Sequence, residues 1–274
     1  MRCPASFWLS ISLLATAAVA QSGPPQSPPQ PTPKTAQNLT PEQRAKVEQL
    51  ARLQKHFGKD MNSPGVELSL KEIGRSRDAD RTLVKYELYA TGFPKKMTYA
   101  LFQVQINGSF IKTLEGVTLD AEGRAICGGG KETCQGNGPN DPIDLIVYAG
   151  KSEPKRFALI SEDNAHLKGF VAVVPFPNST IDKGCNLESI IGTPNGELTY
   201  IEGNGFEPNE QLTIDSESYD EKHHDVAKAE ANGSYFSAVM PNVLGMKSGE
   251  TVWAVKAKNC NPKLSFSWGT YHLE

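Results

Sequence analysis

The sequence predicts an all-β chain of two tandem β-sandwich modules, preceded by one amphipathic α-helix. From about residue 64 onward, apolar and polar residues alternate as they do in half-buried strands. Short turns rich in Gly, Pro and Asn separate these runs, as in sandwich folds. The turn Gly203–Pro208 also has a shorter counterpart, Ala90–Pro94, in an equivalent setting earlier in the chain.

The Gly-Phe turn is the first of three landmarks that predict a duplicated unit. Gly92 and Gly205 tolerate positive φ, so the phenylalanine after each glycine can enter the core below the turn. The other landmark pairs are Asp120–Gly123 with Ala231–Gly233, and Asp144–Ala149 with Thr251–Ala257. All three pairs are separated by nearly equal lengths of chain, which indicates duplication with small differences in loop length.

The second half carries the order Gly-x-Gly-Phe-x-Pro-x-Glu, an alternating strand, an Asn-Gly turn and an aromatic strand. In this order it resembles bacterial immunoglobulin-like repeats of secreted and surface proteins, closely over 185–272 and less closely over 64–175. The resemblance implies immunoglobulin-like β-sandwich modules and no catalytic residue. In the first copy, Lys95 and Lys96 replace the Pro-x-Glu part, so that copy departs from the motif.

Residues 1–20 have the features of a secretory signal peptide. Arg2 supplies a positive charge, an apolar run follows, and the small residues around Val19 predict cleavage after Ala20. The apolar run is too short to span a bilayer as a helix, and no later segment is long enough. We therefore expect an exported protein, periplasmic or secreted, without a transmembrane segment.

The predicted division of the chain continues with residues 21–37, a disordered linker rich in Pro, Gln and Ser. This linker is either a stalk that holds the modules away from a surface or a leader without a role. Residues 38–60 form the amphipathic helix, 61–175 the first sandwich and 176–274 the second.

The helix is predicted over 40–57. Thr40 is suited to the N-cap, Pro41 to the first turn, and Gln43 completes a capping box. Its apolar stripe consists of Val47, Leu50, Leu53 and Phe57. An isolated helix of this length is marginal in water, so it packs on the first module or pairs with a second copy. The stripe is short for a coiled coil, which favours packing within the chain.

Cleavage of the leader leaves four cysteines in an exported chain, and an even number there predicts disulfides. Three pairings are possible, and proximity along the chain favours Cys127–Cys134 and Cys185–Cys260. The alternative, a four-thiolate metal site, lacks the usual Cys-x-x-Cys spacing.

Two segments, 128–138 and 215–225, are interpreted as exposed loops that carry recognition. Their candidate binding residues are Lys131, Asn137, Asp215, Asp220, Glu221, His223 and His224. A metal site is expected to be absent, because the spacing matches no metal motif. The alternative is a metal held by Asp220, His223, His224 and Asp225, whose carboxylates and imidazoles are suitable ligands.

Charge and motifs narrow the function classes. The net charge of −3 and the lack of a basic cluster argue against nucleic acid as a partner. The sequence has no nucleophile motif, no phosphate-binding loop and no cofactor motif. We predict an exported, non-enzymatic binding or spacer protein that contacts a protein or a cell-envelope carbohydrate. The alternatives are a secreted hydrolase with a site between the modules, and a self-associating envelope protein; the oligomeric state stays open.

Overall fold

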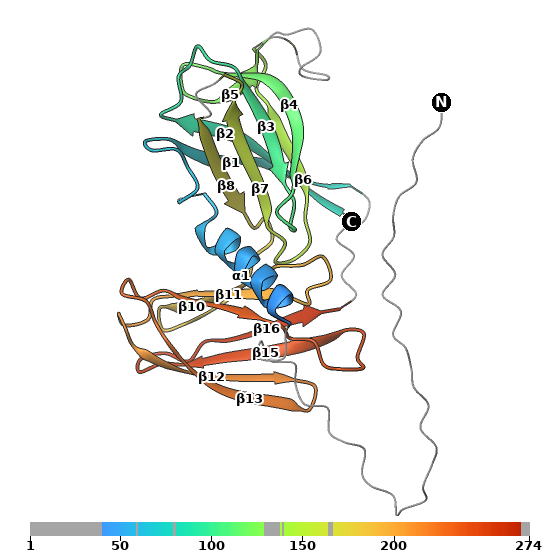
Figure 1. Cartoon of the computed structure of the whole chain (residues 1–274), viewed down its shortest axis with the longest axis vertical. Helices are drawn as coiled ribbons and strands as arrows, with labels where there is room; N and C mark the ends of the chain where they lie inside the picture. The colour runs from blue at the N-terminus through green and yellow to red at the C-terminus, as the bar shows by residue number, and fades with distance from the viewer. Residues whose placement is uncertain are drawn as a thin grey trace, which may run out of the picture. The chain divides into compact units, whose positions relative to one another are not determined.

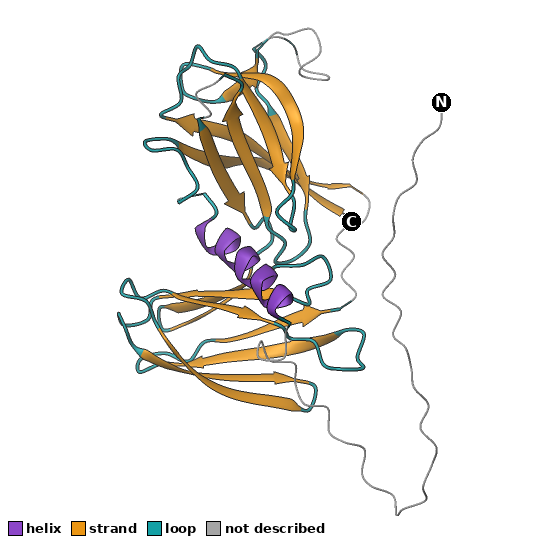
Figure 2. Ribbon diagram, in the orientation of Figure 1, coloured by secondary structure: helices purple, strands orange, loops and turns teal. Residues whose placement is uncertain are grey.

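The structure is a computed structural model that describes residues 40–58, 60–78, 81–128, 138, 140–163 and 167–269. The described residues all belong to one structural unit, Pro33–Glu274. The predicted signal peptide, the Pro-rich linker and the candidates Lys131, Cys134 and Asn137 lie outside the described residues. What is described consists mostly of β-strands, with one helix at its N-terminal end (Figures 1 and 2).

The predicted helix is confirmed as α1 (Pro41–His56). The Thr40 side chain accepts a hydrogen bond from the Gln43 N–H, and the Gln43 side chain accepts one from the Thr40 N–H. This complete capping box satisfies two backbone donors that a helix start otherwise leaves without partners.

Strands β1 to β8 form two antiparallel sheets, which together we call module 1. One sheet has the order β1-β2-β6 and the other the order β5-β4-β3-β7-β8. Buried side chains from both sheets, such as Leu88 and Leu159, form one core, so module 1 is a β-sandwich. The strands are β1 (Glu67–Asp78), β2 (Arg81–Thr91), β3 (Tyr99–Val104), β4 (Phe110–Leu119), β5 (Ala125–Cys127), β6 (Asp144–Tyr148), β7 (Lys155–Ser161) and β8 (Lys168–Val173).

Strands β9 to β16 form a second sandwich, module 2. Its sheets have the orders β14-β11-β10-β9 and β13-β12-β15-β16, and Leu187 and Val255 contribute to a core of its own. The strands are β9 (Asn178–Asp182), β10 (Cys185–Ile191), β11 (Thr199–Asn204), β12 (Gln211–Ser218), β13 (Glu221–Lys228), β14 (Tyr235–Val239), β15 (Gly249–Lys256) and β16 (Lys263–Trp268).

Both modules have the same strand topology. In order, β1, β2, β3, β4, β6, β7 and β8 correspond to β10, β11, β12, β13, β14, β15 and β16. Each set of seven places three strands in one sheet and four in the other, as is typical of immunoglobulin-like sandwiches. The additional strands are β5 in module 1 and β9 in module 2. The predicted fold class is therefore confirmed.

The Gly-Phe turns have equivalent positions in the two modules. Gly92 and Gly205 directly follow the corresponding strands β2 and β11, with φ of 77° and 87°. A Cβ atom at either position would overlap a backbone carbonyl oxygen, that of Gly65 in module 1 and that of Gly184 in module 2. The phenylalanine after each glycine is buried. Only glycine combines this φ with so close an approach of two backbones.

The third predicted landmark is wrong. Asp144–Ala149 contains β6, which pairs with β2 and corresponds to β14, whereas Thr251–Ala257 contains β15, which corresponds to β7. The two segments do not correspond because module 1 has extra residues after Cys127. In module 2, β14 follows the Gly233 turn directly, but in module 1 the chain first forms β5 and reaches β6 only after a long insertion.

Cys185 and Cys260 form the predicted disulfide, with their Cα atoms 6.2 Å apart. It joins the start of β10 to the segment between β15 and β16, and both cysteines lie in the core of module 2. A cross-link over a sequence separation of 75 stabilises a fold by about 4 kcal/mol in the chain-entropy account. Cys127 is also buried, but Cys134 lies outside the described residues, so their pairing stays a prediction.

The helix packs within the chain and contacts both modules. Leu50 lies in an apolar cluster with Ile190 and Tyr200 of module 2. Phe57, just after the helix, makes an edge-to-face contact with Phe170 of module 1. The helix stripe is thus covered by two sandwich surfaces, as the prediction of packing within the chain requires.

Ser152 also connects the modules directly. Its N–H donates to the Phe176 carbonyl at 2.8 Å, and its carbonyl accepts from the Ile191 N–H at 2.8 Å. Its hydroxyl lies 3.0 Å from that of Ser189. These bonds give the junction its own polar network, and the expected boundary between 175 and 176 stays a prediction.

Candidate functional site

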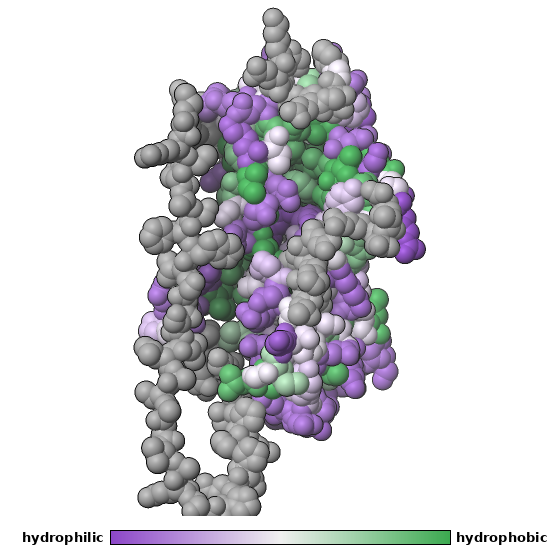
Figure 3. Space-filling view, turned by 90° about the vertical axis from the view of Figure 1, so that its right-hand side faces the viewer, coloured by the Kyte–Doolittle hydropathy of each residue, from purple (hydrophilic) through white to green (hydrophobic). Residues whose placement is uncertain are grey.

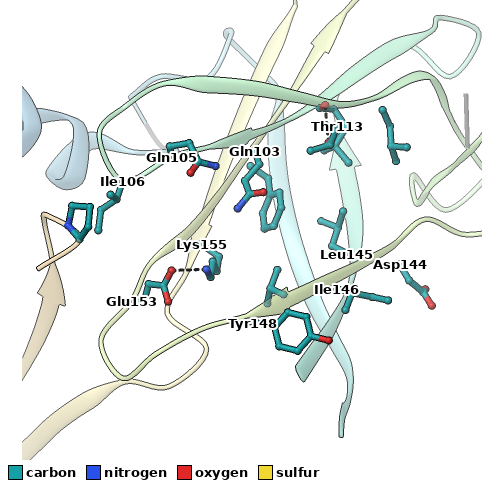
Figure 4. A pocket seen from close by; sticks show the side chains of 15 residues that line it. Gln103, Gln105, Ile106, Thr113, Asp144, Leu145, Ile146, Tyr148, Glu153 and Lys155 are labelled. Carbon is teal, nitrogen blue, oxygen red and sulfur yellow. Dashed lines mark hydrogen bonds and ion pairs between the residues drawn. The ribbon is translucent and has the colours of Figure 1, made fainter. Parts of the chain in front are cut away.

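A groove lies in module 1, where the two sheets separate between β4 and β6. We call it groove 1, and its volume is about 620 Å³. Figure 4 shows that side chains from β3, β4, β6 and β7 surround it. The residues used below are Leu101, Gln103, Thr113, Leu145, Ile146, Val147, Glu153, Lys155 and Phe157.

Groove 1 has an apolar floor and a polar rim, and some of the rim groups pair within the protein. Leu145 and Phe157 in the floor are buried core residues. On the rim, the Lys155 ammonium lies 2.5 Å from a Glu153 carboxylate oxygen, and the Thr113 hydroxyl donates to the Leu101 carbonyl. A surface of this composition gains binding energy mainly by covering apolar area.

Strand β6 forms one border of groove 1 and is the edge strand of its sheet. Within the described residues it pairs with β2 alone, so its outer edge offers free backbone N–H and C=O groups. Ile146 on this strand is 51% exposed and adds apolar surface to the edge. Figure 3 shows hydrophobic side chains gathered on one face of this module. An exposed apolar edge strand is a template for pairing with another chain.

Module 2 has a groove at the corresponding position, between β13 and β14, which we call groove 2. Its lining comes from β12, β13, β14 and β15, the counterparts of β3, β4, β6 and β7, and its volume is about 170 Å³. Its polar lining includes Ser216, Glu221, His223, Asp225, Ser237 and Thr251, with Trp253 beside them. The same place in the fold is therefore hollow in both modules, and both linings combine apolar and polar side chains.

The segment 215–225 is not a loop, contrary to the prediction. It is a β-hairpin of β12 and β13 that turns at Tyr219 and Asp220. The prediction failed because charged residues on an edge strand have the composition of a loop. Since successive side chains of a strand point to opposite faces, the polar residues separate into two groups.

One group lies on the outer face of the hairpin. The His224 imidazole is 2.7 Å from the Asp215 carboxylate, which also pairs with Lys256 at 2.7 Å. Hydrogen bonds from Lys256 and His224 lower the pKa of Asp215. These contacts form an exposed ion-pair group typical of a solvated sheet face.

The other group, Glu221, His223 and Asp225, faces groove 2. His223 and His224 are neighbours on one strand and so point to opposite faces, which separates the ligands of the alternative metal site. Among the described residues, no group of three or more His, Cys, Asp or Glu side chains is placed to hold a metal ion.

Three buried polar atoms of groove 2 have no hydrogen-bond partner of normal geometry: the Glu221 Oε1, the Thr251 hydroxyl and the Trp253 indole Nε1. The Tyr235 hydroxyl lies near the indole, and burial raises its pKa against smaller opposing effects of Ser237 and Trp253. Thr251 is 2% exposed and Trp253 is 7% exposed. The sequence did not mark these two residues as site residues, because both lie at regular inward positions of a strand. An orphaned polar group next to a hollow is the signal that identifies them.

A separate polar cluster lies where α1, β7 and β11 meet. Arg156 is 2% exposed, and its guanidinium donates to the Gln54 side chain. Burial lowers the pKa of Arg156 to about 10, against opposing effects of Tyr200 and Glu202. Burial raises the pKa of Glu202, with smaller opposing effects of Gln54 and Arg156. No sequence signal predicts this cluster, since Arg156 and Gln54 have the composition of surface residues.

The large aromatic residues of module 2 are mostly internal. Tyr235, Trp253 and Trp268 are buried, as the strand alternation predicts. Phe236 stacks on Tyr200 beneath the helix. These side chains therefore stabilise the modules and the helix junction, and the described surface gains no aromatic platform from them.

Solved structures of low similarity to this chain include three multi-domain proteins. A two-domain fibronectin type-III segment of chicken tenascin matches with 12% identity over 74% of this chain and 98% of its own, at a TM-score of 0.21. A bacterial ice-binding adhesin matches with 11% identity over 69% of this chain and 57% of the adhesin chain, at a TM-score of 0.19. A tetra-tandem repeat from the extending region of a large adhesion protein matches with 9% identity. The match covers 74% of this chain and 73% of the matched chain, at a TM-score of 0.21. These TM-scores are low, so the fold description depends on the strand pairing given above.

No model of a known protein family matches the chain, and no curated protein matches its sequence. In the described part of the chain, no helix combines the length and apolar character that crossing a bilayer requires.

Proposed function

We propose that this protein is an exported, non-enzymatic binding protein, and that groove 1 accepts an extended strand of a partner protein. The observation that carries the proposal is the free outer edge of β6 beside an apolar floor. Strand addition to such an edge uses backbone hydrogen bonds for affinity and side-chain pockets for specificity.

The dimensions of groove 1 support an extended peptide. Its volume of about 620 Å³ lies within the roughly 300–1,000 Å³ that is usual for binding sites. Five residues of β6 present an edge about 16 Å long, enough for a short added strand. Ile146 would then pair with an apolar side chain of the added strand.

The polar groups of groove 1 also favour this occupant. Glu153, Lys155 and Thr113 have partners already, so a small polar ligand would find few free groups on them. Gln103 and Gln105 line the same groove beside the outer backbone edge of β6, and a peptide offers both side-chain and backbone groups to bind them.

Export is supported by the signal-peptide pattern of residues 1–20 and by the Cys185–Cys260 disulfide, because disulfides persist in oxidising compartments. A binding role is preferred to a hydrolase because the histidines with hydrogen-bonded side chains pair with exposed aspartates, His56 with Asp60 and His224 with Asp215. Neither imidazole is thereby placed to activate a serine or cysteine.

The test is selection of binders from a random linear peptide library displayed on phage, using the purified chain as bait. We expect selected peptides to alternate apolar and polar residues, and the backbone amides of β6 to become protected from hydrogen exchange when they bind. Ile146→Lys is expected to weaken binding about tenfold or more, because lysine on an edge strand opposes pairing.

The matched control is Ile181→Lys. Ile181 is 75% exposed on β9, the edge strand of a different sheet, so the same substitution there leaves groove 1 unchanged. Peptides that bind equally well to wild type and Ile146→Lys, or that protect amides elsewhere but not in β6, would contradict the proposal.

A further inference from the structure

The lining of groove 2 contains buried polar atoms without hydrogen-bond partners. The Glu221 Oε1, the Thr251 hydroxyl and the Trp253 indole N–H have no partner of normal hydrogen-bond geometry, although all three atoms are buried. A buried polar group without a partner costs free energy, so native structures keep few of them without a reason. Three such atoms around one hollow need polar partners, which water or the hydroxyl groups of a ligand can supply.

The hydrogen-bonding character of these atoms limits the chemistry of that ligand. The Glu221 carboxylate accepts, the Trp253 indole N–H donates, and the Thr251 hydroxyl does both. An ammonium group has no acceptor for the indole, and an anion is repelled by Glu221 and Asp225. A neutral hydroxyl group both donates and accepts, so a ligand carrying several hydroxyls matches the set.

The size of groove 2 agrees with one small polyhydroxylated ring. A volume of about 170 Å³ holds roughly five or six water molecules at their liquid volume. That space suits a single sugar ring and excludes a folded protein loop. Ser216, Ser237 and His223 on the same lining supply further donors and acceptors for ring hydroxyls.

The pleat of β13 explains how the groove acquires this lining. In β12, the inward positions Leu212 and Ile214 are buried apolar residues of the core. Their pairing partners on β13 include Asp225, and the same inward face continues with His223 and Glu221. Inward charges can protect an edge strand from aggregation, but edge protection alone does not account for the orphaned hydroxyl and indole of β15.

We propose that groove 2 is a binding site for one neutral sugar residue, recognised through its hydroxyl groups by Glu221, Thr251 and Trp253. This site is independent of the strand-binding role of groove 1, because it lies in the other module and uses side chains instead of a backbone edge.

The test is titration of the purified chain with glucose, galactose or N-acetylglucosamine, followed by the indole N–H resonances in nuclear magnetic resonance spectra. At least one of these sugars is expected to shift the Trp253 resonance. The Trp268 resonance is expected to move less, because its N–H already donates to the Ser218 hydroxyl at 3.1 Å. Glucuronic acid is expected to bind at least about tenfold more weakly, because its charge meets Glu221 and Asp225.

Two variants connect the binding to these atoms. Thr251→Val and Glu221→Gln are each expected to reduce sugar affinity about tenfold or more. Thr251→Val is expected to keep or raise the melting temperature without sugar, because it removes an orphaned buried hydroxyl. Glu217→Gln is the control, since Glu217 lies on the same hairpin but pairs with Lys222 away from the groove. No shift with any of the three neutral sugars, or an undiminished shift in both variants, would overturn the proposal.

Discussion

At the scale of single residues, the glycine of each Gly-Phe turn combines two requirements that no other residue meets. Gly205 has φ of 87°, and a Cβ there would overlap the carbonyl oxygen of Gly184. The turn thereby brings the end of β11 against the start of β10, and it lets Phe206 enter the core. The conformation and the close approach are separate effects and can be measured separately.

The variant Gly205→Ala is expected to lose about 3 kcal/mol or more of unfolding free energy, because it adds a backbone clash to an unfavourable φ. Gly245→Ala is the matched control. Gly245 has φ of 85° but open space around its Cα, so only the conformational cost of about 1 kcal/mol applies. Urea unfolding of both variants tests this, and equal losses would show that the close approach does not matter.

Residue chemistry also explains what sequence reasoning could and could not predict. Thr40, Gln43 and Gly205 act through local backbone geometry, so their roles are readable from a few neighbouring residues. Arg156 and Gln54 are buried because the helix and β7 meet in space. No local pattern records such a meeting, and polar residues usually indicate surface.

At the scale of elements, the hairpin of β12 and β13 shows the same limit. Its composition predicted a loop. In the strand, alternate side chains point to opposite faces, so some acidic residues face groove 2 and others face solvent. Glu221 and His223, predicted as binding residues of an exposed loop, lie on a strand and line groove 2, and their role in binding stays a prediction. The grooves themselves could not be predicted, because each depends on where two sheets separate.

The contact between α1 and β11 gives an element-scale prediction about pH. Burial raises the folded-state pKa of Glu202 above its ordinary 4.5, and Glu188 is raised in the same way. A raised folded pKa means that the stability contributed by Glu202 is fully present below pH 4.5 and is lost as pH rises through the folded pKa. Glu202→Gln is therefore expected to stabilise the protein more at pH 7 than at pH 4.5.

Urea unfolding at the two pH values measures this difference. Glu217→Gln serves as the control, because Glu217 is exposed and its substitution is expected to change stability little at either pH. If Glu202→Gln changed stability equally at both pH values, burial of that carboxylate would not be the source of the pH dependence.

At the scale of the whole molecule, α1, Ser152 and the buried Arg156 connect the cores of the two modules. Leu50 joins a cluster with residues of module 2, and Phe57 contacts module 1. The shared topology of the modules was predictable from the repeated turns. Their connection was not, because an amphipathic stripe shows that a helix packs without showing on what.

We expect the wild-type chain to unfold in a single calorimetric transition, because the helix is shared by both modules. Leu50→Glu is expected to cost about 3 kcal/mol or more by burying a charge, and to separate the unfolding of the two modules. Gln49→Glu adds the same side chain at the exposed neighbouring position and is expected to keep one transition. Two transitions already in the wild type would contradict this coupling.

The Cys185–Cys260 bond has a mechanical consequence for a protein that holds a partner under load. A pulling force that enters module 2 before Cys185 and leaves after Cys260 passes through the covalent bond and bypasses the 75-residue separation between them. Fully extended, that length would release about 250 Å of slack. The bond prevents this extension, and strands β10 to β15 carry none of the force. Groove 2 therefore stays formed while the chain is under tension.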